Sequence, residues 1–124
     1  MEQYIEQNGI PYKLGEDGLY YPQFELPKDD EAHYDKYGRM RYRYLKEHRE
    51  LLFMQLVMEG RLNRHLNEVD DTANTRMELL IRQMAKQQGV DEDMKERNQM
   101  GWVRAMNNIH ACAEEIVLAE VVYA

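Results

Sequence analysis

LNRHLNEVDDTANTRMELLIRQMAKQQG, residues 62–89, is the stretch that decides the fold. Its apolar side chains recur at spacings of four, three, four, four, three and four residues. On a helix they would share a stripe about 80° wide. Gln88-Gly89 closes the pattern, and glycine commonly follows the last turn of a helix. The pattern therefore predicts one long amphipathic helix over residues 61–88. The stripe consists of Leu62, Leu66, Val69, Ala73, Met77, Leu80 and Met84.

A second long helix is predicted downstream, over residues 91–122. Asp91, Glu92 and Asp93 supply negative charge at its start, which suits the positive end of a helix dipole. Two helices of about 28–30 residues would each be about 42–45 Å long and, joined by a short turn, would pack antiparallel. The remaining chain is too short to cover such a pair, so a homodimer that closes part of one stripe is a hypothesis. The second stripe consists of Trp102, Met106, Ile109, Ala113, Ile116 and Val117.

Short helices are predicted upstream of this pair, over residues 36–59. Residues 51–58 (LLFMQLVM) are apolar on nearly every side of a helix, and such a helix is expected to be buried. Gly60 is expected to break the chain before the long helix. Residues 36–49 (KYGRMRYRYLKEHR) are expected to form a short helix that is interrupted near His48.

Residues 36–49 are also an island of positive charge, with six Lys and Arg residues against one Glu, in a chain whose net charge is −7. Helical spacing would put basic residues on one face and apolar and aromatic residues on the opposite face. Arg41 falls among the apolar positions, and we expect a carboxylate partner because an unpaired buried charge is costly. The basic face consists of Arg39, Arg43 and Lys46, and the opposite face of Tyr37, Met40 and Tyr44.

The first 35 residues differ in character from the rest. Asn8-Gly9 and Asp17-Gly18 are hairpin turn dipeptides between short apolar and aromatic runs, so we predict a small β-hairpin or meander over this part. The polar run from Phe24 to Tyr34 is expected to be an extended connector. The predicted fold class is α+β, mostly α, with the β-hairpin packed on a helical bundle that contains the long antiparallel pair. We expect residues 1–124 to form a single domain, with 1–35 as hairpin and connector.

Composition excludes several classes of protein. Cys112 is the one cysteine, so an intrachain disulfide is impossible, and no apolar run approaches the roughly 20 residues that cross a bilayer. The first residues have no basic flank and no apolar segment of a secretory signal. We therefore expect a cytoplasmic protein without a membrane partner. The net charge argues against general nucleic-acid binding, although it permits a local basic patch.

Four motifs in order resemble one known family. They are YIEQNGIPY at 4–12, KYGRMRYRYLKEHR at 36–49, EGRLNRHLNEVDDTA at 59–73 and NQMGWVRAMNNIHACAEEIVLAEVVY at 98–123. Together they cover essentially the whole chain and look like the TnpV-type transposon-encoded proteins of bacterial mobile elements. The resemblance implies a protein carried by transposons or integrative elements. It implies no defined activity.

The residues do not indicate catalysis or a cofactor. His110 and Cys112 are two residues apart on a predicted helix and would point about 160° apart, so they could not share a metal ion as neighbours. Cys112 is expected to be a small buried residue and His110 a polar group at the helix flank. The chain has no serine, and it has no Gly-rich phosphate loop of Rossmann or Walker spacing. We expect no enzyme, no metal and no cofactor; the metal candidates considered are His33, His48, His65, His110 and Cys112.

Two binding functions fit the sequence. The first is a nucleic-acid-associated factor of a mobile element, whose island clamps phosphates. The same pattern also fits a charged helix that only neutralises acidic surroundings. The alternative is an acidic inhibitor or adaptor that binds a host or element-encoded protein, for instance a defence nuclease of the CRISPR type. The nucleic-acid candidates are Lys36, Arg39, Arg43, Lys46 and Arg49; the protein-binding candidates are Asp29, Asp30, Glu31, Asp70, Asp71, Asn107 and Asn108.

Overall fold

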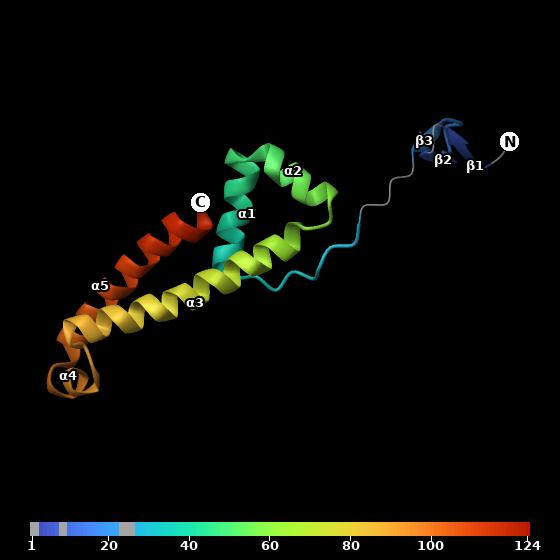
Figure 1. The fold of residues 1–124 in the computed structure, drawn as a ribbon. Coiled ribbons are helices and arrows are strands. Elements are labelled where there is room, and N and C mark those ends of the chain that lie inside the picture. The colour runs from blue at the N-terminus through green and yellow to red at the C-terminus, as the bar shows by residue number, and fades with distance from the viewer. Residues whose placement is uncertain (1–2, 8–9, 23–26) are drawn as a thin grey trace.

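The computed structural model describes residues 3–7, 10–22 and 27–124 (Figure 1). A small antiparallel sheet comes first and helices follow, so the predicted class, α+β and mostly α, is confirmed. The predicted turn at Asn8-Gly9 and the start of the connector at Phe24 lie outside the described residues. The elements are β1 (Tyr4–Gln7), β2 (Ile10–Leu14), β3 (Tyr20–Pro22), α1 (Lys36–His48), α2 (Glu50–Met58), α3 (Leu62–Gln88), α4 (Glu92–Arg97), α5 (Gln99–Val117) and the π-helical turn η1 (Leu118–Val122).

Helix α3 is the spine of the helical part, as its apolar stripe predicts. Helix α5 returns along it in the antiparallel sense, and α1 packs across α3 and against η1 (Figure 1). Burial of the stripe side chains drives this packing, since each removes apolar surface from water. One core joins α1, α3, α5 and η1, and a second joins α1, α2 and α3. The first contains Tyr37, Ala73, Met77, Leu80, Ala113, Val117 and Val122, and the second Leu45, Leu56 and Leu66.

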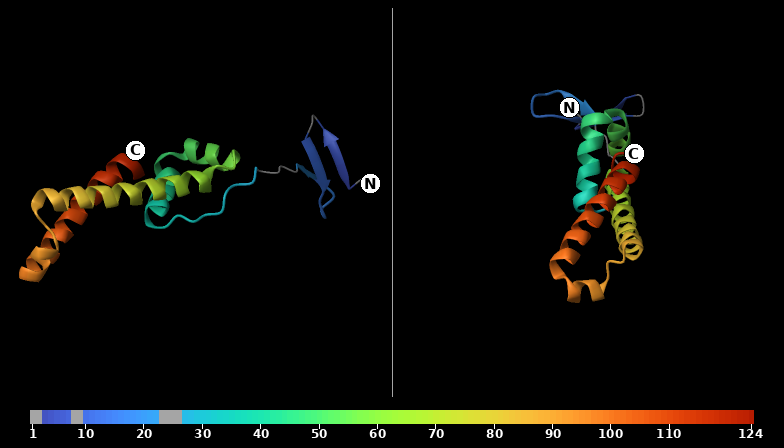
Figure 2. Two further views of the ribbon diagram at one scale, coloured as in Figure 1. Left: turned by 60° about the horizontal axis from the view of Figure 1, so that its bottom comes forward. Right: turned by 90° about the vertical axis from the view of Figure 1, so that its left-hand side faces the viewer.

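The three strands form a meander in the order β1-β2-β3. Tyr4 pairs with Lys13 and Leu14 with Tyr20, and the predicted turn at Asp17-Gly18 is confirmed, with Gly18 at φ 82°. The predicted packing of this sheet on the bundle is wrong, because no described strand contacts a described helix (Figure 2). Tyr4 and Tyr21 of the sheet accordingly stay exposed. The assignment of residues 1–124 to a single domain stays a prediction.

The connector before α1 lies along α3 without regular structure. Asp29 accepts hydrogen bonds from the backbone N–H groups of Asn63 (2.7 Å) and Arg64 (3.2 Å), at the start of α3. Burial by itself would raise the pKa of Asp29, but backbone N–H donors together outweigh it and lower the pKa. Asn67 accepts from the N–H of Tyr34, and its amide donates to the carbonyl of Glu31. Hydrogen bonds between the connector and α3 therefore fix the path of the connector.

The second long helix is broken, contrary to the prediction for residues 91–122. Asp91 caps α4 by accepting from the N–H of Met94 at 2.9 Å, as its acidic start suggests. Asn98 then leaves helical geometry, with φ −150° and ψ 81°, and accepts from the N–H of Gly101 at 3.1 Å. An asparagine side chain offers the backbone this alternative to a continuous helix. The chain therefore restarts as α5 at Gln99.

Helix α2 is mostly exposed, although its apolar sequence predicts burial. The breaks that bound it are in the predicted places, at Arg49 and at Gly60. Only Leu56 of α2 is buried, because α1 and α3 contact one side of the helix and no described element covers the other. Leu51, Met54 and Met58 consequently face solvent.

Candidate functional site

A groove on the outer face of α1 brings the predicted cations together. It has a volume of about 700 Å³, and we refer to it as the α1 groove. Arg39, Arg43 and Lys46 are exposed, and Tyr37 on the opposite face is buried, as the helical spacing predicts. The groove is lined by Tyr34, Arg39, Tyr42, Arg43, Lys46, Glu47 and Glu50.

Two half-buried tyrosines supply the aromatic part of the α1 groove. Tyr42 packs edge-on against Phe53 of α2, with ring centroids 5.5 Å apart and an interplanar angle of 84°. The ammonium group of Lys46 lies 5.9 Å from the centroid of the Tyr42 ring, within cation–π range. Tyr34 is held by the hydrogen bond of its N–H to Asn67. The sequence analysis missed both residues, although the i, i+4 spacing of Tyr42 and Lys46 is a signal for their contact.

The five predicted nucleic-acid-binding residues are not equivalent. Lys36 forms an ion pair with Glu114 at 2.7 Å, and this hydrogen bond raises the pKa of Lys36. Arg39 lies 3.6 Å from Asp35 in an exposed pair, which contributes little stability and is easily exchanged for another anion. Arg43, Lys46 and Arg49 form no ion pair with any residue that the structure describes. These three, with Arg39, are therefore the cations available to an anionic ligand.

A second groove lies on the other side of Arg43, between α1 and the end of the chain. Its volume is about 540 Å³, and Tyr44 and Tyr123 pack there with ring centroids 5.3 Å apart. Arg43 and Glu47 line both grooves and form the ridge between them. The remaining lining residues are Met40 and His48.

Arg41 is buried, but none of the described Asp and Glu side chains pairs with it, contrary to the prediction of a carboxylate partner. Its guanidinium donates from Nη1 to the backbone carbonyls of Val122 (3.1 Å) and Ala124 (2.7 Å), and from Nε to Nε2 of His65 (3.2 Å). Burial lowers the pKa of Arg41, which nevertheless stays charged because arginine titrates far above neutral pH. Carbonyl and imidazole acceptors therefore satisfy this guanidinium and tie α1 to the end of the chain.

His65 must be neutral to accept the hydrogen bond from Arg41. Burial lowers the pKa of His65, and the positive charge of Arg41 lowers it further. The unfolded chain then binds a proton that the folded chain does not, so folding stability should fall as the pH drops below about 6.5. Urea unfolding at pH 7.5 and 5.5, with His65→Gln beside the wild type, measures this loss.

The glutamine variant keeps an acceptor for Arg41 but cannot titrate, so we expect a smaller loss of stability between the two pH values. The exposed His33, His48 and His110 are common to both proteins and cancel in the comparison. Equal losses in variant and wild type would contradict the assignment to His65.

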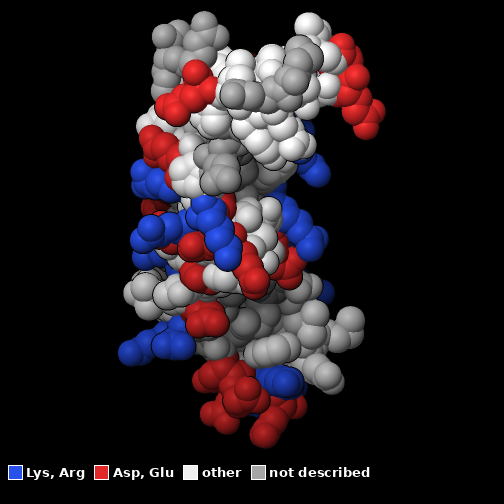
Figure 3. All heavy atoms as spheres, turned by 90° about the vertical axis from the view of Figure 1, so that its right-hand side faces the viewer, with Lys and Arg blue, Asp and Glu red and all other residues white. Residues whose placement is uncertain are grey.

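The predicted protein-binding residues divide into two groups. Asp70 is buried and so is not available to a protein partner as predicted; its carboxylate accepts from the N–H of Gly38 and from the amide of Asn74, both at 3.1 Å. Asp29 likewise holds the start of α3. A separate group of acidic side chains lies at the α4 end of the molecule, at the bottom of Figure 3. The predicted residues that remain exposed are Asp30, Glu31, Asp71, Asn107 and Asn108.

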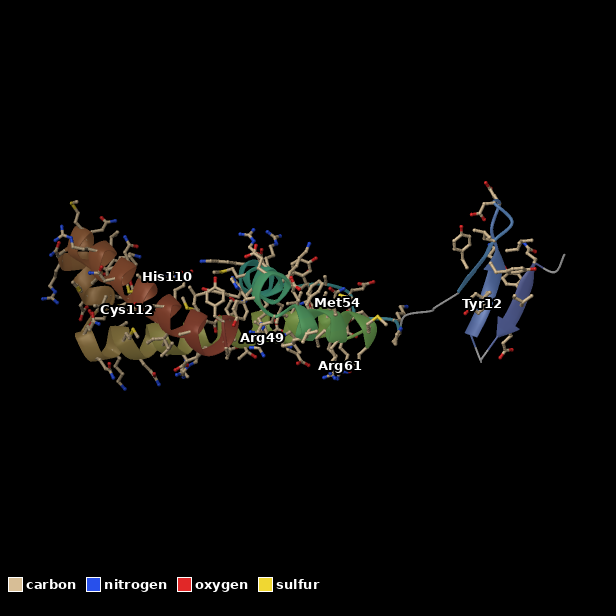
Figure 4. The ribbon with its side chains drawn as sticks, turned by 90° about the horizontal axis from the view of Figure 1, so that it is seen from above. Tyr12, Arg49, Met54, Arg61, His110 and Cys112 are labelled. Carbon is tan, nitrogen blue, oxygen red and sulfur yellow. The ribbon has the colours of Figure 1, made fainter. Side chains whose placement is uncertain are left out.

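Cys112 is exposed, so its predicted burial is wrong; its neighbour Ala113 takes the buried position on α5. His110 lies at the helix flank, 3.7 Å from Glu114. Figure 4 shows both on α5, well away from Arg49, Met54 and Arg61 at the α1–α2 end. Among the described residues, no three His, Cys, Asp or Glu side chains form a group that could hold a metal ion.

Comparison with known families shows to which family the chain belongs. The sequence model of the family described as transposon-encoded protein TnpV matches residues 2–122. The chain belongs to the TnpV family. The match spans the sheet, the connector and all the helices, and so confirms the resemblance in the four motifs. No curated protein and no solved structure matches this TnpV protein. None of its described helices combines the length and the apolar character needed to cross a bilayer.

Proposed function

We propose that this TnpV protein is a non-catalytic accessory protein of its mobile element and binds nucleic acid through the α1 groove. One observation carries the proposal: Arg39, Arg43 and Lys46 line the same groove as Tyr34 and Tyr42. Cations beside half-buried tyrosine rings suit a flexible strand, because the cations contact phosphates while bases stack on the rings. Membership of a transposon-encoded family supports a role close to DNA or RNA.

The groove favours weak, salt-sensitive binding. Its three cations are opposed by Glu47 and Glu50, which also line it, so its net charge is only slightly positive. Each phosphate contact releases condensed counterions, and a single strand that engages three cations should show a slope of log K against log salt of about −2. A single strand fits the groove better than a duplex does, since the half-buried tyrosines can stack only on unpaired bases.

Reversal of two charges tests the proposal. We expect Arg39→Glu/Arg43→Glu to weaken binding of a labelled random single strand at least tenfold and to flatten the salt slope. The two new carboxylates would repel the phosphates that the arginines attract. Fluorescence anisotropy at low and moderate salt measures both quantities.

Arg82→Glu/Arg104→Glu is the matched control. Both arginines are exposed, on the parts of α3 and α5 that lead to and from α4, and the reversal changes the net charge equally, from −7 to −11. The control should keep most of the affinity. Equal losses of affinity in both double variants would show that overall charge, and not the α1 groove, governs binding. No binding by the wild type at low salt would overturn the proposal and favour the acidic protein-binding alternative.

A further inference from the structure

The outer face of α2 is an apolar surface with a regular helical pattern. Leu51 is 89% exposed, Met54 54% and Met58 58%. These residues follow one another at i, i+3 and i+7, with exposed Gln55 at i+4, so they form one seam along the helix. A soluble protein rarely exposes such a seam without a partner for it.

We propose that this face of α2 binds the same face of a second copy of the chain, with the two α2 helices antiparallel. The seam is self-complementary about a two-fold axis between Met54 and Gln55. Antiparallel pairing places Leu51 of each protomer opposite Met58 of its partner, and the two Met54 side chains meet near the axis. An isologous contact of this kind closes on itself and leaves no exposed seam.

A hollow in the surface fits this arrangement. It lies at the bend between α1 and α2 and has a volume of about 620 Å³. Leu51 and Leu52 line it, at the end of the seam where the antiparallel partner places its flexible Met58. The surface therefore has a projecting side chain at one end and a receiving hollow at the other. The other residues around the hollow are Glu47, His48, Arg49, Glu50 and Gln55.

The charges at the two ends of the seam favour the antiparallel sense and a protein partner. Arg49 has no ion-pair partner among the described residues, and the antiparallel partner brings its Glu59 close to this guanidinium. Glu59 pairs with Arg61 of its own chain at 3.0 Å, but this pair is exposed and easily exchanged. Parallel pairing would instead place Arg49 against Arg49 and Glu59 against Glu59, and like charges repel. Around the seam the carboxylates of Glu47, Glu50 and Glu59 outnumber the guanidinium groups of Arg49 and Arg61, which makes an anionic membrane an unfavourable occupant.

The contact is small, so the dimer should be weak. Helix α2 has nine residues and is about 13 Å long. One face of so short a helix buries less area than the roughly 800 Å² per partner of a stable dimer interface. We expect dissociation in the range of about 10–100 µM. This contact differs from closure of the long helical stripes, because it leaves α3 and α5 free.

Sedimentation velocity without nucleic acid tests the dimer, independently of the proposed groove function. From low micromolar to submillimolar protein, the average mass should rise from 14.9 kDa toward twice that value. Leu51→Glu/Met54→Glu should stay monomeric throughout with unchanged far-UV circular dichroism, because both side chains are exposed. Met100→Glu alters a methionine on α5 that is even more exposed, 77% against 54% for Met54, and should dimerise like the wild type.

A charge swap tests the antiparallel sense. Arg49→Glu and Glu59→Arg should each weaken dimerisation about tenfold, because like charges then meet across the axis. The double variant restores opposite charges and should recover most of the loss. A monomeric wild type, a dimer insensitive to Leu51→Glu/Met54→Glu, or a double variant weaker than both single variants would overturn the proposal. So would a monomer that co-sediments with phosphatidylcholine vesicles, which would assign the face to lipid.

Discussion

Asn67→Leu should lower the free energy of unfolding by about 3 kcal/mol. Asn67 is buried, and its amide serves three backbone groups of the connector. Its Oδ1 accepts from the N–H groups of His33 (2.9 Å) and Tyr34 (3.1 Å), and its Nδ2 donates to the carbonyl of Glu31 (2.8 Å). Leucine has the same number and branching of side-chain heavy atoms but leaves all three groups without a partner. Each buried polar group that is left unpaired costs about 1–3 kcal/mol, part of which water recovers at the edge of the connector.

Urea denaturation followed by far-UV circular dichroism measures the effect. Asn107→Leu, at an exposed position on α5, is the matched control and should change stability by less than about 0.5 kcal/mol. Asn67→Asp keeps the acceptor for His33 and Tyr34 but loses the donor to Glu31. Its loss of stability should therefore lie between those of Asn67→Leu and Asn107→Leu. A loss below about 1 kcal/mol for Asn67→Leu would mean that these hydrogen bonds do not hold the connector.

This polar contact shows how far the sequence predicts the fold. The apolar stripe of α3 is a local signal, and it predicted the helix and its buried face correctly. Polar residues recur on the same helix at spacings of four, three and four, from Asn63 through Asn67 and Asp70 to Asn74. That pattern is also visible in the sequence. Its partner is not, because the connector lies more than thirty residues upstream and contributes backbone groups that every residue has.

Burial was predicted less well, for a related reason. Residues 51–58 are apolar on almost every side, but burial depends on which elements the topology places around a helix, and only one side of α2 is covered. Arg41 gives a second example. Its position predicted a buried guanidinium, whereas backbone carbonyls near the end of the chain, which no side-chain pattern marks, are its main acceptors.

The candidate site follows the same division between local and distant information. Helical spacing alone placed Arg39, Arg43 and Lys46 together. It could not show that Lys36 forms an ion pair with Glu114 of α5. Nor could it show that Tyr34 lies beside the cations, since hydrogen bonds to α3 fix the path of the connector there.

Gly60→Ala should cost about 3 kcal/mol, and Gly89→Ala only about 1 kcal/mol. The two glycines have the same local role. Each follows a helix with positive φ, 66° at Gly60 and 68° at Gly89. Each also lies in a Schellman motif, in which the next residue donates back to the helix, from Arg61 to the carbonyl of Leu56 and from Val90 to that of Ala85.

Their surroundings differ, and this difference sets the expected gap. A Cβ at Gly89 would meet nothing within 4 Å, so alanine there costs only the strain of the left-handed backbone. A Cβ at Gly60 would lie 2.5 Å from the carbonyl oxygen of Pro27. That oxygen belongs to the backbone, two residues before Asp29, which is itself bound to the start of α3, so it cannot move aside cheaply. Urea unfolding of both variants measures the gap. Equal losses would show that the connector shifts freely near Pro27, whereas a larger loss at Gly60 places the connector firmly against the end of α2.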